Sequence, residues 1–232
     1  MLDFNRFEVL TFDCYGTLID WEMGIIEALR PILASHDLFP GDEELLALYA
    51  EAEAKAESGG YIRYREVLRR AFESVLVRLG VHAVPAELDL VARSLPNWPP
   101  FDDTIEALAA LKRGFKLAVI SNTDDDLFAL TAQTLRTPFD WVVTAEQVRA
   151  YKPSAANFDY ALRRIGVPKE KVLHVAQSLH HDIATAKRLG WSAVWVNRRA
   201  GRAGSGATPA AQAAPDLEVP DLKTLVSMAA AR

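Results

Sequence analysis

The chain has 232 residues, half of them hydrophobic and a quarter charged, with a formal net charge of -5 at pH 7. This composition is typical of a soluble globular protein, and the acidic balance argues against nucleic acid as a partner. No apolar run approaches the roughly 20 residues that a membrane-spanning helix needs. The N-terminus lacks the pattern of an export signal, and the single Cys14 excludes an internal disulfide. We therefore expect a cytoplasmic protein with no membrane partner.

The first predicted element is a short apolar run, residues 9–13, which ends at Asp13 and is followed by Gly16. This pattern favours a buried parallel strand that carries an acidic side chain to its C-terminal end. The same pattern returns three times further along the chain, and a shorter candidate strand lies at residues 141–144. The three repeats are residues 116–121, ending at Asn122, residues 173–176, ending at Gln177, and residues 193–196, ending at Asn197.

Residues 19–98 interrupt this pattern, because they contain helical apolar spacing and no candidate strand. Later helices are predicted at residues 103–113 and at residues 154–165, the latter with Ser154 as its cap and Gly166 at its end. Residues 200–214 are rich in Gly, Ala, Ser and Pro, which favours a mobile loop, and a last strand and helix follow. The fold class is thus α/β, with a Rossmann-like doubly wound parallel sheet and an inserted α-helical domain. The predicted core comprises residues 1–18 and 99–232, and the insert comprises residues 19–98.

Several polar residues follow the predicted strands, and the carboxyl ends of parallel strands are where α/β enzymes place their sites. These residues are Asp13, Ser121, Asn122 and the segment from Gln177 to Asp182, with Lys152 on a loop between them. A nucleophilic carboxylate, hydroxyl and amide donors, a lysine and a second carboxylate would meet there. Taken singly, each has an ordinary structural role, such as capping a helix or forming a turn. Their order along the chain is the stronger signal.

Four segments carry a resemblance to a known family: FDCYGTLID at residues 12–20, ISNT at residues 120–123, YKP around Lys152, and QSLHHDI at residues 177–183. They resemble the four motifs of the haloacid dehalogenase superfamily, in which a helical cap inserted after the first motif is typical. The resemblance implies that Asp13 attacks the substrate and that Lys152 orients and neutralises it. It also implies that Ser121 and neighbouring amides hold an anionic group.

Two positions decide which branch of the superfamily the chain resembles. Phosphatase-like members have an acid two residues after the nucleophile, where this chain has Tyr15, and an aspartate at the start of the fourth motif, where it has Gln177. A halide is so weak a base that it leaves without an acid, and Mg²⁺ prefers anionic oxygens. The first motif also has the form typical of L-2-haloacid dehalogenases. We therefore predict hydrolytic dehalogenation of a small 2-haloalkanoic acid through an ester on Asp13, with no cofactor and no metal.

In this hypothesis Thr17 steadies Asp13, and water activated near Asp182 and His180 hydrolyses the ester. Tyr15 and Trp21 wall the pocket, and Ser121, Asn122, Gln177 and His180 complete the substrate-binding set. His180 and His181 fit a helix start better than a metal site.

The substrate-reading residues differ from those of the dehalogenases that the chain resembles. Those enzymes have a cap arginine that helps the halide leave, whereas Ala50 stands near that place here. Three cap arginines, Arg63, Arg65 and Arg69, are candidates to replace it. Two alternatives stay open: a phosphatase that acts on a small phosphate ester with Mg²⁺, and a catalytically silent binding protein. Capped members often pair through cap helices, so a homodimer is possible by resemblance.

Overall fold

The computed structural model describes residues 2–202 and 204–230, and its centre is a six-stranded, fully parallel sheet. The strand order is β3-β2-β1-β4-β5-β6, so β1 lies between β2 and β4 in the middle of the sheet. The strands are β1 (Val9–Phe12), β2 (Lys116–Ser121), β3 (Trp141–Thr144), β4 (Val172–Ala176), β5 (Ser192–Val196) and β6 (Leu217–Val219). The α/β prediction is confirmed, and the five strands predicted before the C-terminal one agree within a residue or so at their ends.

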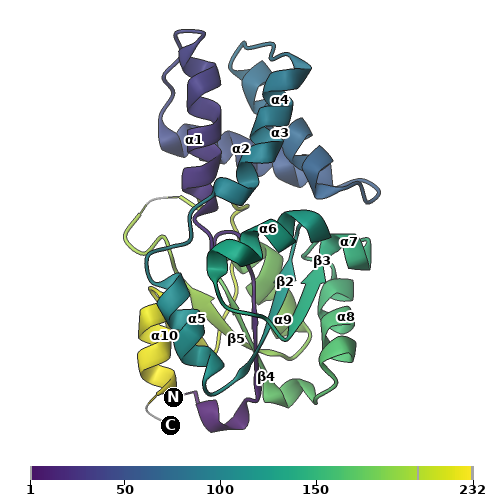
Figure 1. Cartoon of the computed structure of the whole chain (residues 1–232), viewed down its shortest axis with the longest axis vertical. Coiled ribbons are helices and arrows are strands. Elements are labelled where there is room, and N and C mark those ends of the chain that lie inside the picture. The colour runs from purple at the N-terminus through teal and green to yellow at the C-terminus, as the bar shows by residue number, and fades with distance from the viewer. Residues whose placement is uncertain (1, 203, 231–232) are drawn as a thin grey trace.

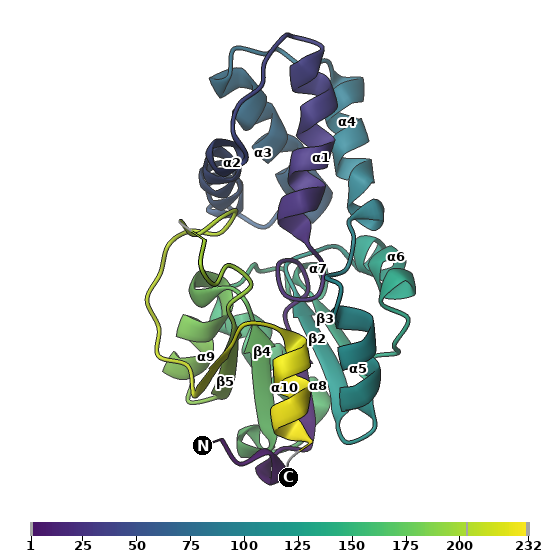
Figure 2. The same ribbon diagram turned by 90° about the vertical axis from the view of Figure 1, so that its left-hand side faces the viewer.

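Helices cover both faces of the sheet because the buried strands are apolar on both sides (Figures 1 and 2). Leu10 and Phe12 of β1 belong to one apolar cluster, which includes residues of α5 (Thr104–Lys112) and α10 (Leu222–Ala229). Val9 points to a second cluster, which includes residues of α8 (Ala155–Ile165). The remaining core helices are α6 (Asp125–Leu135), α7 (Ala145–Val148) and α9 (Ala184–Arg188), with short turns at Phe4–Arg6, Lys169–Lys171 and Leu179–Ile183.

Local sequence signals set the ends of these helices. The Ser154 hydroxyl accepts a hydrogen bond from the N–H of Ala156 at the start of α8, as predicted for a capping residue. Gly166 ends the same helix with a left-handed backbone (φ +77°). The helix therefore stops where β4 has to begin its approach to the sheet.

Four helices form the insert, which stands above the carboxyl ends of the strands, opposite the two termini (Figure 1). They are α1 (Trp21–Ala34), α2 (Asp42–Glu57), α3 (Tyr64–Arg78) and α4 (Pro85–Ser94), followed by a turn at Leu95–Asn97. The two segments that join the insert to the core are hydrogen-bonded to each other, Asp20 N–H to Pro99 O (2.8 Å) and Phe101 N–H to Leu18 O (3.1 Å). The insert is called the cap below, and the boundaries at residues 18/19 and 98/99 stay a prediction.

The segment predicted as a mobile loop, residues 200–214, packs against the cap instead. Ala207 and Thr208 are buried, and the Ala207 N–H donates to Glu22 Oε1 (3.2 Å). Gly206 has φ +64° and lies so close to Glu22 that an added Cβ would be 1.7 Å from Oε1. The prediction of mobility was wrong for this middle part because the small residues permit close packing against the cap. Residue 203 lies outside the described residues.

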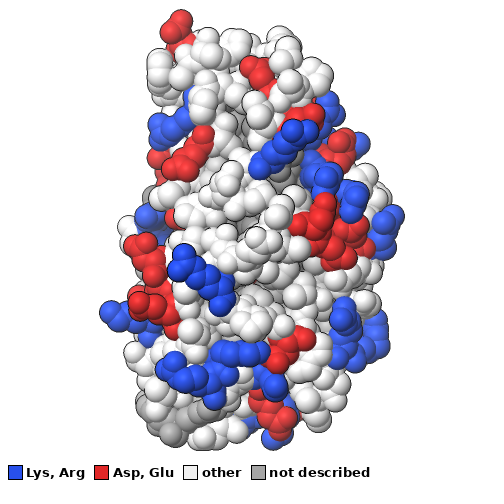
Figure 3. Space-filling model, viewed as in Figure 1, with Lys and Arg blue, Asp and Glu red and all other residues white. Residues whose placement is uncertain are grey.

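Charged side chains of both signs are interspersed over the face in Figure 3, so that face has no broad patch of one sign. In the part of the chain that the structure describes, no helix is both long and apolar enough to cross a membrane.

Candidate active site

Asp13 follows β1 directly and lies at the carboxyl edge of the sheet, where its N–H donates to Val175 O of β4 (3.1 Å). The next residues fold back in a tight turn in which the N–H groups of Leu18 and Ile19 both donate to Cys14 O. Gly16 in this turn has φ +92°, and an added Cβ would lie 3.0 Å from polar atoms of two neighbouring side chains. This turn brings the Thr17 hydroxyl to 2.6 Å from Asp13 Oδ2.

Lys152 is the cation of the site, and its side chain is buried. Its ammonium donates to Asp13 Oδ1 (2.8 Å), Asp182 Oδ1 (2.7 Å) and Ile120 O (2.9 Å), so that all three protons have acceptors. Burial alone would lower the pKa of Lys152, but the two carboxylates raise it to about 12. The amide of Asn122 holds the lysine's own backbone, accepting from Lys152 N–H (2.7 Å) and donating to Lys152 O (3.1 Å).

The two carboxylates that share this ammonium differ in their surroundings. Burial raises the pKa of Asp13, against the opposing effects of Lys152 and Thr17. Burial also acts to raise the pKa of Asp182, but Lys152 and His174 lower it to about 2. We infer that Asp182 is the more firmly ionised of the pair, because it has a second hydrogen-bond donor.

His174 is that second donor and was not among the predicted site residues. It lies inside β4, and its Nε2 is 2.9 Å from Asp182 Oδ1 while its Nδ1 is 2.9 Å from Thr11 Oγ1. An ionised carboxylate only accepts hydrogen bonds, so Nε2 carries the proton and, in a neutral ring, Nδ1 accepts from Thr11. Asp182 lies in a single π-type turn, Leu179–Ile183, and its Oδ2 is buried with no partner among the described residues. The sequence signal was a lone histidine in an apolar strand.

The space above Asp13 is nearly filled by the cap, leaving a cavity of about 20 Å³ that has room for roughly one water molecule. Three cap residues on α2 and α3 line it that were not among the predicted site residues: Glu53, Glu57 and Tyr64. Thr208, from the packed segment described above, also lines it. The cavity lining on the core side consists of Asp13, Tyr15, Asn122, Lys152, Ser178 and His181, and Trp21 at the start of α1 completes it.

Three predicted binding residues lie away from this cavity. Ser121 is buried at the end of β2, and its hydroxyl has no hydrogen-bond partner in the described part of the chain. The side chain of Gln177 lines a neighbouring depression with Trp195, while its N–H donates to Thr17 Oγ1 (2.8 Å). His180 lines another depression, and the adjacent His181 faces both that depression and the cavity. Burial lowers the pKa of His181 to about 3, so it is neutral near pH 7.

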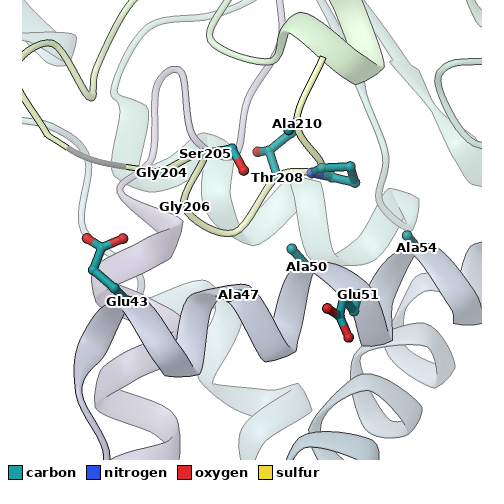
Figure 4. A pocket seen from close by; sticks show the side chains of 11 residues that line it. Glu43, Ala47, Ala50, Glu51, Ala54, Gly204, Ser205, Gly206, Thr208 and Ala210 are labelled. Carbon is teal, nitrogen blue, oxygen red and sulfur yellow. The ribbon is translucent and has the colours of Figure 1, made fainter.

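The cap arginines proposed as replacements bind elsewhere. Arg63 is paired with Glu146, Arg65 with Asp124 and Asp126, and Arg69 lies 3.9 Å from Asp89. None of the three lines the cavity, so none of them takes the place of the missing arginine in this structure. The pairs of Arg63 and Arg65 instead join the cap to the core. Ala50 lines a separate depression between α2 and residues 204–210 and brings no charge to it (Figure 4).

The donor set does not fit the Mg²⁺ of phosphatase-like members. The described residues include no group of three or more His, Cys, Asp or Glu side chains that could hold a metal ion. The ammonium of Lys152 lies between the carboxylates of Asp13 and Asp182 and already neutralises charge at the position where a metal cation would do so. The side chain at the start of the fourth motif is the neutral Gln177, and its Oε1 is buried beside Gly16 with no partner among the described residues.

Known proteins share this arrangement of sheet and cap. The family model described as haloacid dehalogenase-like hydrolase matches residues 7–190. A (S)-2-haloacid dehalogenase of Pseudomonas putida is 24% identical over 201 residues, which are 83% of this chain and 85% of that protein. A glyceraldehyde 3-phosphate phosphatase of Methanothermobacter thermautotrophicus is 38% identical over 101 residues, 42% of this chain and 45% of that one. The structure of an L-2-haloacid dehalogenase from Xanthobacter autotrophicus with chloropropionic acid covalently bound superimposes with a TM-score of 0.79 at 22% identity, covering 96% of this chain and 98% of that chain.

Proposed function

The chain belongs to the haloacid dehalogenase-like hydrolases, and we propose that it acts in two steps through a covalent ester on Asp13. The substrate that we propose is a small 2-haloalkanoic acid, as in the names of several relatives. The observation that carries the proposal is the combination of a carboxylate held by Lys152 and Thr17 with a tyrosine where an acid would otherwise stand.

In the first step a carboxylate oxygen of Asp13 attacks C2 of the substrate, the C–O bond forms and the halide leaves with the electron pair of the C–X bond. Lys152 favours the ionised form of Asp13, and Thr17 fixes the orientation of the carboxylate by its hydrogen bond to Oδ2. The N–H groups of Tyr15 and Asn122 have no acceptor within the described residues, and both residues line the cavity. These N–H groups are the donors that we assign to the substrate's carboxylate.

In the second step water attacks the ester carbonyl of Asp13, and the bond between this carbonyl carbon and the substrate oxygen breaks. One proton of the water goes to the departing alkoxide and the other to solvent, so that the alcohol product leaves and the carboxylate regains one oxygen from water. Asp182 Oδ2 is the hydrogen-bond acceptor that we assign to this water, because it has no partner among the described residues while Oδ1 binds Lys152 and His174. A carboxylate with a pKa of about 2 is a weak base, so we assign to Asp182 the orientation of the water. Both steps as proposed use only residues of this chain and water.

Tyr15 decides the kind of leaving group. Its hydroxyl is hydrogen-bonded to Thr131 Oγ1 (2.9 Å), and burial raises its pKa well above 10. Such a group is a poor acid near pH 7, so it gives little help to an alkoxide that leaves in the first step, whereas a halide leaves this step unprotonated.

The test is halide release from L- and D-2-chloropropionate and from chloroacetate with EDTA present. We expect release that persists in EDTA and is abolished in Asp13→Asn. Phosphate release from a small phosphate ester with Mg²⁺ is measured in parallel. Mg²⁺-dependent phosphate release without any halide release would overturn the proposal in favour of a phosphatase, and inactivity of the folded protein in both assays would favour a binding protein.

A further inference from the structure

The roof of the Asp13 cavity is acidic. Glu53 and Glu57 lie one turn apart on α2, and both line the cavity. Glu53 is only 3% exposed, although a glutamate is rarely buried without a partner of opposite charge. The two-step chemistry above gives neither of these carboxyls a role.

One oxygen of Glu53 is fixed by two tyrosines. Oε1 accepts hydrogen bonds from Tyr49 OH and Tyr64 OH, both at 2.9 Å. The ring of Tyr49 packs edge-on against Trp21, with 6.0 Å between ring centroids, and against Phe72 at 5.4 Å. The carboxyl is therefore held in one orientation from two helices of the cap.

The other oxygen, Oε2, has no hydrogen-bond partner among the described residues, and its side chain lines the cavity. The carboxyl of Glu53 is thus a buried, oriented hydrogen-bond acceptor with one oxygen left for a ligand. A buried carboxylate oxygen without a hydrogen-bond donor is costly. A ligand that donates to Oε2 therefore forms a hydrogen bond that the free protein lacks.

The cavity provides no positive charge for this acceptor. Lys152 is the only lysine or arginine among the described lining residues, and its three protons go to Asp13, Asp182 and Ile120 O. His181, the histidine among the described lining residues, is neutral near pH 7. Two unit charges of the same sign 4 Å apart repel by about 4 kcal/mol at an effective dielectric constant of 20. A ligand that places only negative charge near Glu53 is therefore disfavoured.

We propose that Glu53, with Glu57 beside it, binds a protonated amino group of the substrate. This inference rests on the proposed function and deepens it: the substrate is a small halogenated acid that also carries an ammonium group. Because the cavity has room for roughly one water molecule, the cap has to move away from the core to admit this substrate. In the bound state the backbone N–H groups of Tyr15 and Asn122 bind its carboxylate, Asp13 faces the carbon that bears the halogen, and the cap binds its ammonium.

Burial raises the pKa of Glu53 to about 7, with Tyr64 and Tyr49 acting to lower it. The other ionisable groups of the lining are Tyr15, Glu57, Tyr64, Asp13, Lys152 and His181. Burial and the charge of Glu53 raise the pKa of Glu57 well above its ordinary 4.5, so the two carboxyls oppose each other's ionisation until a cation binds. Binding of a cation favours the charged carboxylate, so ammonium affinity should increase as the pH rises from 6 to 8.

Binding of propylammonium and of propionate, measured by titration calorimetry at pH 8, tests the inference without any turnover. We expect propylammonium to bind the wild-type protein and to bind at least tenfold more weakly to Glu53→Gln. The matched control is Glu44→Gln, an exposed glutamate on the same helix, which should leave the affinity unchanged. No propylammonium binding to the wild type, or equal affinity in Glu53→Gln, would overturn the inference.

Circular dichroism checks that each variant is folded. If Glu53→Gln does not fold, Glu57→Gln takes its place, because Glu57 is only half-buried. We expect this variant to bind propylammonium at least threefold more weakly than the wild type, and unchanged affinity would overturn the inference. Turnover is compared on a matched pair, 2-chlorobutanoate and 4-amino-2-chlorobutanoate. We expect kcat/KM to be at least tenfold higher for the amino compound, and an equal or lower value would count against the inference. Absence of halide release from both compounds would contradict the proposed function, while the calorimetry would still decide the role of Glu53.

Discussion

The substitution Glu53→Gln should change how the stability of the protein depends on pH. Burial raises the pKa of this carboxyl from an ordinary value of 4.5 to about 7 in the folded chain. Between these two values the folded state binds more protons than the unfolded state, so the free energy of unfolding falls as the pH rises. One pKa unit corresponds to about 1.4 kcal/mol, which makes the total loss from this group about 3 kcal/mol by pH 8.

Glutamine keeps an oxygen that can accept from Tyr49 and Tyr64, and it has no proton to lose. Relative to Glu53→Gln, the wild-type protein should therefore lose about 3 kcal/mol of unfolding free energy between pH 4.5 and pH 8. Urea unfolding followed by circular dichroism at half-unit pH steps measures this difference, with Glu44→Gln as the control that should follow the wild type. The same pH dependence of the unfolding free energy in wild type and Glu53→Gln would refute the reasoning. It would mean that the Glu53 carboxyl has the same pKa in the folded and the unfolded chain.

Three further substitutions test the site and its surroundings. Lys152→Met removes the cation that Asp13 shares, so ester formation should slow by about 10³-fold or more in single-turnover kinetics, and retention of a tenth of the rate would contradict the assigned role. Thr17→Val leaves the part-buried N–H of Gln177 without its acceptor and should cost about 1–3 kcal/mol in urea unfolding, whereas a change within 0.3 kcal/mol would not fit the geometry. Arg199→Ala removes the ion pairs to two cap glutamates, so trypsin should cleave at Arg202 several-fold faster than in the wild type, and an unchanged rate would argue against this anchoring.

The arrangement of Asp13, Thr17 and Lys152 could be predicted from sequence because it depends on local rules. Each residue stands at or just beyond the end of an apolar run or within a motif, and the carboxyl ends of parallel strands meet at one edge. The order of the motifs was enough to predict that Asp182 lies at the same edge, where its Oδ1 is 2.7 Å from Lys152 Nζ. The helical insert was likewise visible as the one long interruption in the alternation of strands and helices.

The cap's contribution could not be read in the same way. Glu51 and Glu53 are two residues apart on one helix, yet Glu51 is exposed and pairs with Arg78 while Glu53 is buried over the site. Which of them faces the cavity depends on how the cap lies on the core, and this is a long-range property. The packing of Ala207 and Thr208 is also long-range, because a small-residue composition fits a flexible loop and a closely packed segment equally well.

The most direct test of the central claim is a single turnover of L-2-chloropropionate in H₂¹⁸O, followed by mass spectrometry of the peptide that contains Asp13 and of the lactate product. Water that attacks the ester carbonyl leaves its oxygen on the enzyme, so we predict ¹⁸O in the Asp13 carboxylate and none in the newly formed hydroxyl of lactate. Lactate that carries ¹⁸O, together with an unlabelled Asp13, would show that water attacks the substrate directly and would contradict the covalent mechanism.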